Sequence, residues 1–392
     1  MMRKRVLFYF IVFSIFFEIS CERAVLKEEL SNKMELIIYD SVDLPDNKII
    51  YIKDYNQSIN TFVGIFGTTV VGFNQDSVVF SFNRMGDGPE EYNNDLLPKY
   101  SNVRFDTDSS LMINSYNKLK YYTLKGDFIK SFKIDEAAIY AQRNILGCHP
   151  DDKSLFFFQG DNTWNEEDRE IHKTPLEYDL VPNFFTYSSI DSTTQAYGAP
   201  EKENAMRIKE RSFPINEPLA VLNSEKLVVN VLFSGDFKLF SYDMNNPEKY
   251  KVTQLEPCNV PKQNFLPKGN MTDKTRNLVD SYCVMNTFYE LLYTSKDTII
   301  TKYRKGISED LFQEEFAKKK DEYKVLCDNV KDHLEYYIKG KKQYMDFLIP
   351  DNYFIRYIGG VNKILFNKKG QDLIKDGKPI KRLYFARLKC NK

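Results

Sequence analysis

Segment 81–92, Ser-Phe-Asn-Arg-Met-Gly-Asp-Gly-Pro-Glu-Glu-Tyr, places a cation, acids and a phenol among turn-forming residues. Arg84 has the chemistry to bind an anionic or carbohydrate ligand, with Glu91 orienting its guanidinium. The alternative is structural: Arg84 and Glu91 pair across the turn while Tyr92 packs against neighbouring strands. Glycine and proline dictate a backbone path by themselves, so we favour the structural role and expect Gly88 to have a positive φ.

A second candidate lies in the polar segment 160–182, which contains the only tryptophan. Trp164 is suited to stacking on a sugar ring, and Asp161 and Asn162 are suited to accepting hydroxyl hydrogen bonds. A solvated insertion with its tryptophan folded inward is the simpler interpretation. The acids of this segment lack the regular alternation and glycine of a calcium loop, so we predict no metal site here.

The remaining chemistry-bearing residues are scattered. The three histidines are far apart, the six cysteines form no Cys-x-x-Cys pair, and the sequence has no nucleophile elbow, metalloprotease helix, P-loop or dinucleotide fingerprint. We therefore expect no metal and no cofactor. Two carboxylates converging from distant parts of the chain would leave no linear motif, so acid-base hydrolysis or elimination stays open.

The elements that position these residues are short alternating strands. Tyr and Phe supply 26 and 30 residues, and the clearest strands are 110–115, 118–123 and 128–134, separated by Asn-Lys and Gly-Asp turns. This order resembles the repeat unit of NHL-type and TolB-like propellers. The pattern Phe82-x-Arg84-x-Gly86-x-Gly88-Pro89-x-Glu91-Tyr92 resembles the signature of the six-bladed β-propeller lipoproteins common in Bacteroidetes.

The resemblance implies an all-β propeller over residues 34–392, with six blades favoured. Ring closure removes exposed strand edges, so we expect strand 35–39 to pair with strand 382–388. One helical insertion is predicted at about 308–340, with Ser308 as N-cap and an apolar stripe that includes Leu311, Leu334 and Tyr337.

The N-terminus has the pattern of an export signal. Three basic residues precede an apolar run at 6–17 that is broken only by Ser14, and Ile19-Ser20-Cys21 resembles a lipobox. We expect residues 1–21 to be a signal peptide, Cys21 to be lipidated and 22–33 to be a tether. The alternative is ordinary cleavage that leaves Cys21 as a plain thiol.

Overall charge gives no support for nucleic-acid binding, because Lys plus Arg and Asp plus Glu both number 55. Residues 300–392 hold 22 basic and 13 acidic residues, which we interpret as a solvated face. The favoured function is a non-enzymatic, outer-membrane lipoprotein of the cell envelope, periplasmic or surface-facing, that recognises a glycan, peptide or envelope protein. The alternatives are a polysaccharide hydrolase or lyase with channel carboxylates, and a structural subunit of an envelope complex.

Overall fold

The computed structural model describes most of the chain from Met34 to Cys390. The described residues are 34–45, 50–92, 103–115, 118–134, 145–149, 151–159, 183–197, 211–212, 218–223, 226–233, 238–255, 266–267, 287–295, 298–305, 309–319, 331–338, 346–349, 353–359, 363–368 and 373–390. The predicted leader, Cys21 and the tether lie outside this part of the chain.

Antiparallel sheets account for nearly all of the described structure. The first sheet comprises β2 (Ile50–Asn56), β3 (Thr61–Phe66), β4 (Thr69–Phe73) and β5 (Val78–Phe82). The second comprises β6 (Val103–Thr107), β7 (Ser110–Ser115), β8 (Lys118–Thr123) and β9 (Phe128–Lys133). The third comprises β10 (Ile145–Cys148), β11 (Leu155–Gln159), β12 (Phe184–Ser188) and β13 (Thr193–Tyr197).

The fourth sheet comprises β15 (Pro218–Asn223), β16 (Val228–Phe233), β17 (Lys238–Asp243) and β18 (Tyr250–Gln254). The fifth comprises β20 (Thr287–Ser295), β21 (Thr298–Lys305), β22 (Lys331–Ile338) and β23 (Asp346–Leu348). A five-stranded terminal sheet has the order β1 (Met34–Pro45), β27 (Lys378–Cys390), β25 (Ile364–Lys368), β24 (Tyr353–Ile358), with β26 (Leu373–Lys375) also on β27. A short pair joins β14 (Arg211–Ser212) to β19 (Leu266–Pro267).

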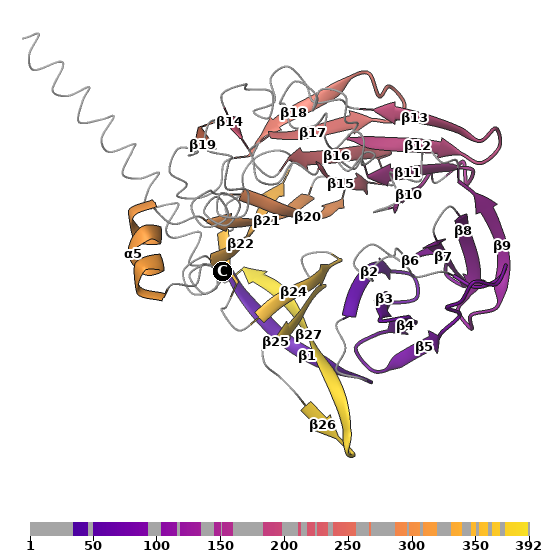
Figure 1. The fold of residues 1–392 in the computed structure, drawn as a ribbon, viewed down its shortest axis with the longest axis horizontal. Helices are drawn as coiled ribbons and strands as arrows, with labels where there is room; N and C mark the ends of the chain where they lie inside the picture. The colour runs from indigo at the N-terminus through magenta and orange to yellow at the C-terminus, as the bar shows by residue number, and fades with distance from the viewer. Residues whose placement is uncertain are drawn as a thin grey trace, which may run out of the picture.

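These sheets stand around a common centre, so the β-propeller expected from the sequence is confirmed (Figure 1). Each sheet packs both faces on its neighbours, as the hydrophobic clusters show. Phe62 of the first sheet, for example, shares a cluster with Phe385 of the terminal sheet, while Val63, the next residue, shares one with Leu111 of the second sheet. Burial on both faces explains why β3 and β7 are buried along their whole length.

The two ends of the described chain close the ring, as predicted. β1 pairs with β27 over their length, with Glu35 opposite Lys389 and Pro45 opposite Ile380. Within this pair the Asp43 carboxylate accepts hydrogen bonds from Arg382 Nε at 2.6 Å and Nη2 at 3.0 Å. The Arg382 guanidinium lowers the pKa of Asp43, so this contact contributes stability at neutral pH.

The helix predicted at about 308–340 is wrong in its C-terminal part, 331–338. A helix, α5, spans Glu309–Lys319, but Lys331–Ile338 is strand β22, which pairs with β21. Leu334 and Tyr337 are buried in sheet contacts and Leu311 on α5 is exposed. Apolar spacing in β22 satisfies a helical template by chance, and pairing with β21 decides its conformation. Ser308 lies outside the described residues.

Connections at the two ends of the ring differ in length. β2 and β6 run in the same direction, because Asp54 Oδ2 accepts from Phe105 N and Asn56 Nδ2 donates to Asp108 Oδ1. Since strands alternate in direction within each sheet, every connection at the end where these strands finish is seven residues or shorter. We call this the short-turn end.

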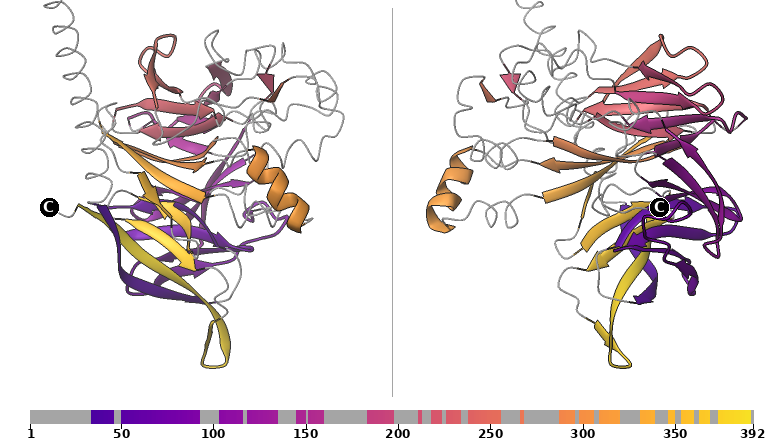
Figure 2. Two further views of the ribbon diagram at one scale, coloured as in Figure 1. Left: turned by 90° about the vertical axis from the view of Figure 1, so that its left-hand side faces the viewer. Right: turned by 45° about the vertical axis from the view of Figure 1, so that its right-hand side comes forward.

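The opposite end, which we call the long-connection end, carries segments 83–102, 134–144, 160–183, 198–217, 255–286 and 306–330. Figure 2 shows α5 and the β14–β19 pair on one side of the ring and the C-terminal end of the chain on the other. Because Met34 pairs with Cys390, the described chain starts on the side away from the long connections.

Candidate functional site

The signature loop, residues 83–92, is closed on itself by Tyr92. Tyr92 N donates to Arg84 O at 3.0 Å, and the Tyr92 hydroxyl accepts from Arg84 N at 3.2 Å while donating to Thr68 O at 2.6 Å. The ring of Tyr92 is buried and lies 6.0 Å from the ring of Tyr122, edge to face. Burial raises the pKa of Tyr92, so its hydroxyl remains a donor at neutral pH. Tyr92 thus packs between the first and second sheets.

The loop's glycines leave room for the Glu91 side chain to fold back over the loop. Gly88 N donates to Glu91 Oε2 at 3.0 Å, so the carboxylate folds back over the loop. A Cβ atom on Gly86 would lie 2.0 Å from this oxygen. The expectation of a positive φ at Gly88 is wrong, because neither Gly86 nor Gly88 is among the described residues that have one.

Lys120 of β8 fastens the loop to the second sheet. Its side chain is 4% exposed, and its ammonium donates to Pro89 O at 3.2 Å and to Glu91 O, with Gly88 O at 3.5 Å. Tyr122 Oη, on the same strand, donates to Glu90 O at 2.9 Å. Burial lowers the pKa of Lys120, with Lys118 adding to the effect. The loop is therefore held by a buried cation that sequence reasoning missed.

Arg84 lies exposed at the edge of this loop. Its Nε donates to Gly126 O at 3.1 Å, in the turn between β8 and β9. Gly126 has a φ of +88°, and a Cβ there would lie 2.6 Å from Phe82. The expected Arg84–Glu91 pair is absent from the contacts of the described residues, because Glu91 folds onto Gly88 instead. One edge of the guanidinium is thus fixed by the second sheet.

A second polar cluster lies on the first strands of three successive sheets. The two carboxylate oxygens of Asp54 in β2 accept from Tyr55 N at 2.9 Å and Phe105 N at 3.0 Å. Arg104 in β6 donates from Nη1 to Leu146 O of β10 at 2.8 Å. Burial raises the pKa of Asp54, and the charge of Arg104 opposes that rise. These contacts join the sheets, and no linear motif announces them.

Three other predicted site residues lie outside the described part of the chain. They are Asp161, Asn162 and Trp164, in the segment 160–182 that connects β11 to β12. Among the described residues no group of three or more His, Cys, Asp or Glu could hold a metal ion. No helix of the described part is long and apolar enough to cross a membrane.

Comparison with known proteins places the fold. No family model and no curated protein matches the sequence. A crystal structure of a DUF4221 family member from Bacteroides vulgatus superposes with a TM-score of 0.63 and 11% identity, over 92% of this chain and 99% of that one. A "Putative exported protein" from Bacteroides fragilis superposes with a TM-score of 0.53 and 11% identity, over 92% and 96%. At this identity the likeness establishes the fold alone.

Proposed function

We propose that the chain is an exported, lipid-anchored recognition module of the cell envelope with six blades. The five four-stranded sheets and the terminal sheet support that blade count. Export is supported by the signal-like residues 1–17 and by the description of the Bacteroides fragilis neighbour. Cys21 is the proposed lipidation site, and the ligand is a glycan, peptide or envelope protein.

The observation that carries the proposal is the difference between the two ends of the ring. The long connections concentrate at one end, and binding residues commonly lie on the connections of a rigid scaffold. β1 begins at the other end, so a tether at 22–33 leaves the long-connection end directed away from the membrane. That orientation suits the presentation of a binding surface.

Within that end, two groups of residues are the proposed ligand contacts. Segment 160–182 brings Trp164 with Asp161 and Asn162, a set suited to a sugar ring and its hydroxyls. Arg84 brings a guanidinium whose Nε is already positioned by Gly126 O. Because this group is held in place before a ligand arrives, less conformational entropy is lost on binding.

Asp54, a carboxyl group of the innermost strand β2, does not itself support carbohydrate hydrolysis. A catalytic pair needs two carboxyl groups roughly 5 to 10 Å apart, with one free to donate a proton and the other to attack or activate water. Both oxygens of Asp54 instead accept backbone N–H groups. Asp54 is therefore assigned to joining β2 and β6.

The test is a glycan array probed with the soluble fragment from Glu22 onward, alongside variants Trp164→Ala and Arg84→Gln. A matched control is Lys153→Gln, which changes an exposed residue in a connection at the short-turn end. We expect a specific glycan hit that is weakened about tenfold or more by Trp164→Ala and is unaffected by Lys153→Gln, as expected for loss of one stacking contact. If Trp164→Ala and Arg84→Gln both bound the glycan as tightly as the wild type, the proposed surface would be contradicted.

Anchoring is tested separately. Cys21→Ala is expected to move the full-length chain from the membrane fraction to the soluble fraction, because the lipid can no longer be attached. Unchanged fractionation would remove the anchor from the proposal while leaving the binding surface to stand or fall on the array.

A further inference from the structure

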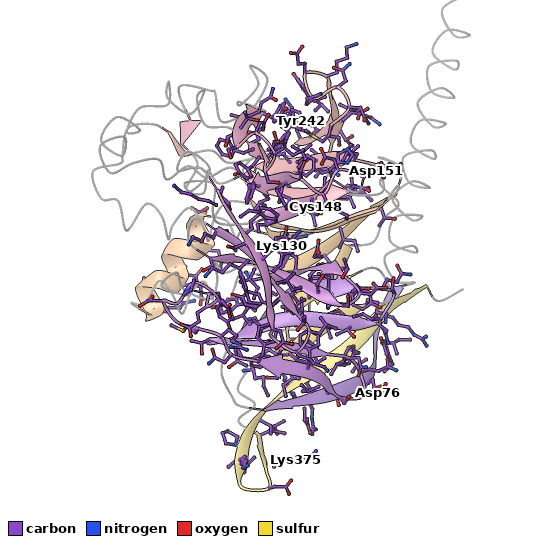
Figure 3. The ribbon with its side chains drawn as sticks, turned by 90° about the vertical axis from the view of Figure 1, so that its right-hand side faces the viewer. Asp76, Lys130, Cys148, Asp151, Tyr242 and Lys375 are labelled. Carbon is purple, nitrogen blue, oxygen red and sulfur yellow. The ribbon has the colours of Figure 1, made fainter. Side chains whose placement is uncertain are left out.

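The β26–β27 hairpin extends from the rim of the ring as a preorganised element. Lys375 pairs with Lys378 across a two-residue turn, in which Asp376 has a φ of +52° and Gly377 a φ of +73°. Positive φ at both central residues is the I′ geometry that matches the twist of a hairpin. Figure 1 shows β26 projecting below the terminal sheet, and Figure 3 shows Lys375 near the tip, clear of the other sheets.

The base of the hairpin is fixed in the terminal sheet. Ile380 is buried opposite Pro45, and Arg382 holds Asp43 through two hydrogen bonds. Because the base and the turn are both determined, presenting this hairpin to a partner costs little conformational entropy.

One face of the hairpin exposes apolar side chains to solvent. Ile374 is 75% exposed and lies opposite Pro379, which is also exposed. Strand pairs that lie opposite each other share a face of the sheet, so these two side chains form one small apolar surface. Because so little of the Ile374 side chain is buried, it contributes little hydrophobic free energy to folding.

Lysines flank the hairpin on both faces: Lys381 shares the face of Pro379, and the Lys375–Lys378 pair lies on the other face. Lys378 and Lys381 have no ion-pair partner among the described residues, while Lys375 lies 3.4 Å from Asp43, which is already bound to Arg382. Within residues 373–381, Asp376 in the turn is the single acidic residue, against three lysines. Part of the basic excess of the C-terminal region is therefore concentrated in the hairpin that exposes Ile374.

We propose that residues 373–381 dock on a protein partner that has an acidic rim around an apolar pocket. Complementary charge would steer the encounter, and burial of Ile374 would supply affinity. This docking surface is separate from the ligand surface proposed above and does not depend on it.

A protein surface is favoured over a lipid surface for two reasons. The hairpin lies at the end of β27 opposite Cys390 and Met34, about 40 Å away at the rise of an extended strand, so a tether before Met34 does not bring it to the anchoring membrane. The surface also contains one aliphatic side chain and a proline, without the Trp, Phe and Leu residues that anchor interfacial segments.

The experiment places a photo-crosslinking amino acid at position 374 of the full-length chain in its native cells. The matched control is position 190, because Ile190 is 81% exposed and lies in the turn between β12 and β13 at the short-turn end. We expect a discrete protein adduct from position 374 and none from position 190. Mass spectrometry of the adduct should identify a partner peptide that contains acidic and apolar residues.

Charge reversal provides the second arm. Lys378→Glu with Lys381→Glu is expected to reduce the adduct at least tenfold, while Lys378→Arg with Lys381→Arg retains it. Neither lysine has an ion-pair partner among the described residues, so we expect an unchanged melting temperature. That measurement shows whether the charge-reversed variant is folded. The proposal is overturned by an adduct with lipid or a second copy of this chain, by a partner peptide without acids, by an adduct that survives charge reversal, or by no adduct.

Discussion

Lys120→Met tests the central structural conclusion, that a buried cation holds the signature loop against the second sheet. Methionine preserves the length and most of the volume of the side chain but removes the ammonium that Pro89 O and Glu91 O accept from. Because Lys120 is 4% exposed, water cannot take its place without moving the strand or the loop. The carbonyl groups must then lose their partner or leave the surface of β8.

The expected cost follows from the hydrogen bonds that are lost. A hydrogen bond to a charged group contributes roughly 1.5 to 3 kcal/mol net. Two are lost, but the cost of burying the ammonium, which is also the main reason for its lowered pKa, disappears with it. The exposed side of the loop can also recover some hydration, so we expect a loss of about 2 kcal/mol.

The assay is trypsin cleavage after Arg84 in the folded protein. When the loop opens and closes faster than it is cut, the cleavage rate follows the opening equilibrium, so 2 kcal/mol corresponds to an increase of about 30-fold. Lys118→Met is the control, because Lys118 is a half-buried lysine of the same strand. Its replacement removes the same charge as Lys120→Met. Equal cleavage rates in the two variants and the wild type would refute the assignment of Lys120.

Three further predictions address other contacts. Gly86→Ala is expected to destabilise the fold by at most about 1 kcal/mol, because its Cβ displaces the end of the Glu91 side chain and breaks its hydrogen bond to Gly88 N; in a Glu91→Ala chain the same substitution should cost nothing further in urea denaturation. Asp43→Asn is expected to cost about 1 kcal/mol at pH 7, with the difference from wild type vanishing as pH falls below the ordinary Asp pKa of 3.8, whereas Asp76→Asn in an exposed turn should cost nothing measurable. Burial raises the pKa values of Tyr92, Tyr121 and Tyr122, so the native state retains protons that the unfolded state loses near pH 10. Stability should therefore decrease above that pH despite the opposite sign of Lys120, and the share of the phenolate absorbance that these buried tyrosines contribute should appear only with unfolding.

Local sequence was sufficient to predict the strands that are separated by typical turn-forming residues. In the second sheet, strands expected at 110–115, 118–123 and 128–134 correspond to β7, β8 and β9 within one residue. The turn at Gly126 has the positive φ that glycine tolerates. Pairing of the two chain ends was also predictable, since an unpaired edge is a liability in any closed ring.

Prediction failed where distant residues decide the conformation. The apolar spacing of Lys331–Ile338 fits a helix, but β21 offers a free edge that pairs with all eight residues. Gly86 and Gly88 were singled out for their backbone freedom, but neither has a positive φ; the Glu91 side chain instead occupies the space where their Cβ atoms would lie. No pattern within the loop indicates that Lys120, about thirty residues away in the chain, binds it.

The signature loop can serve structure and recognition together because different atoms of Arg84 are involved. Gly126 O accepts a hydrogen bond from Arg84 Nε, which fixes the plane of the guanidinium against the second sheet. Arg84 is exposed, so the other side of that plane remains available for a ligand acceptor. Glu91 and Tyr92 differ, since Glu91 Oε2 accepts a hydrogen bond from Gly88 N and the hydroxyl of the buried Tyr92 accepts from Arg84 N and donates to Thr68 O. If this loop contacts a ligand, Arg84 is therefore the residue that does so, and Glu91 and Tyr92 act by keeping it in place.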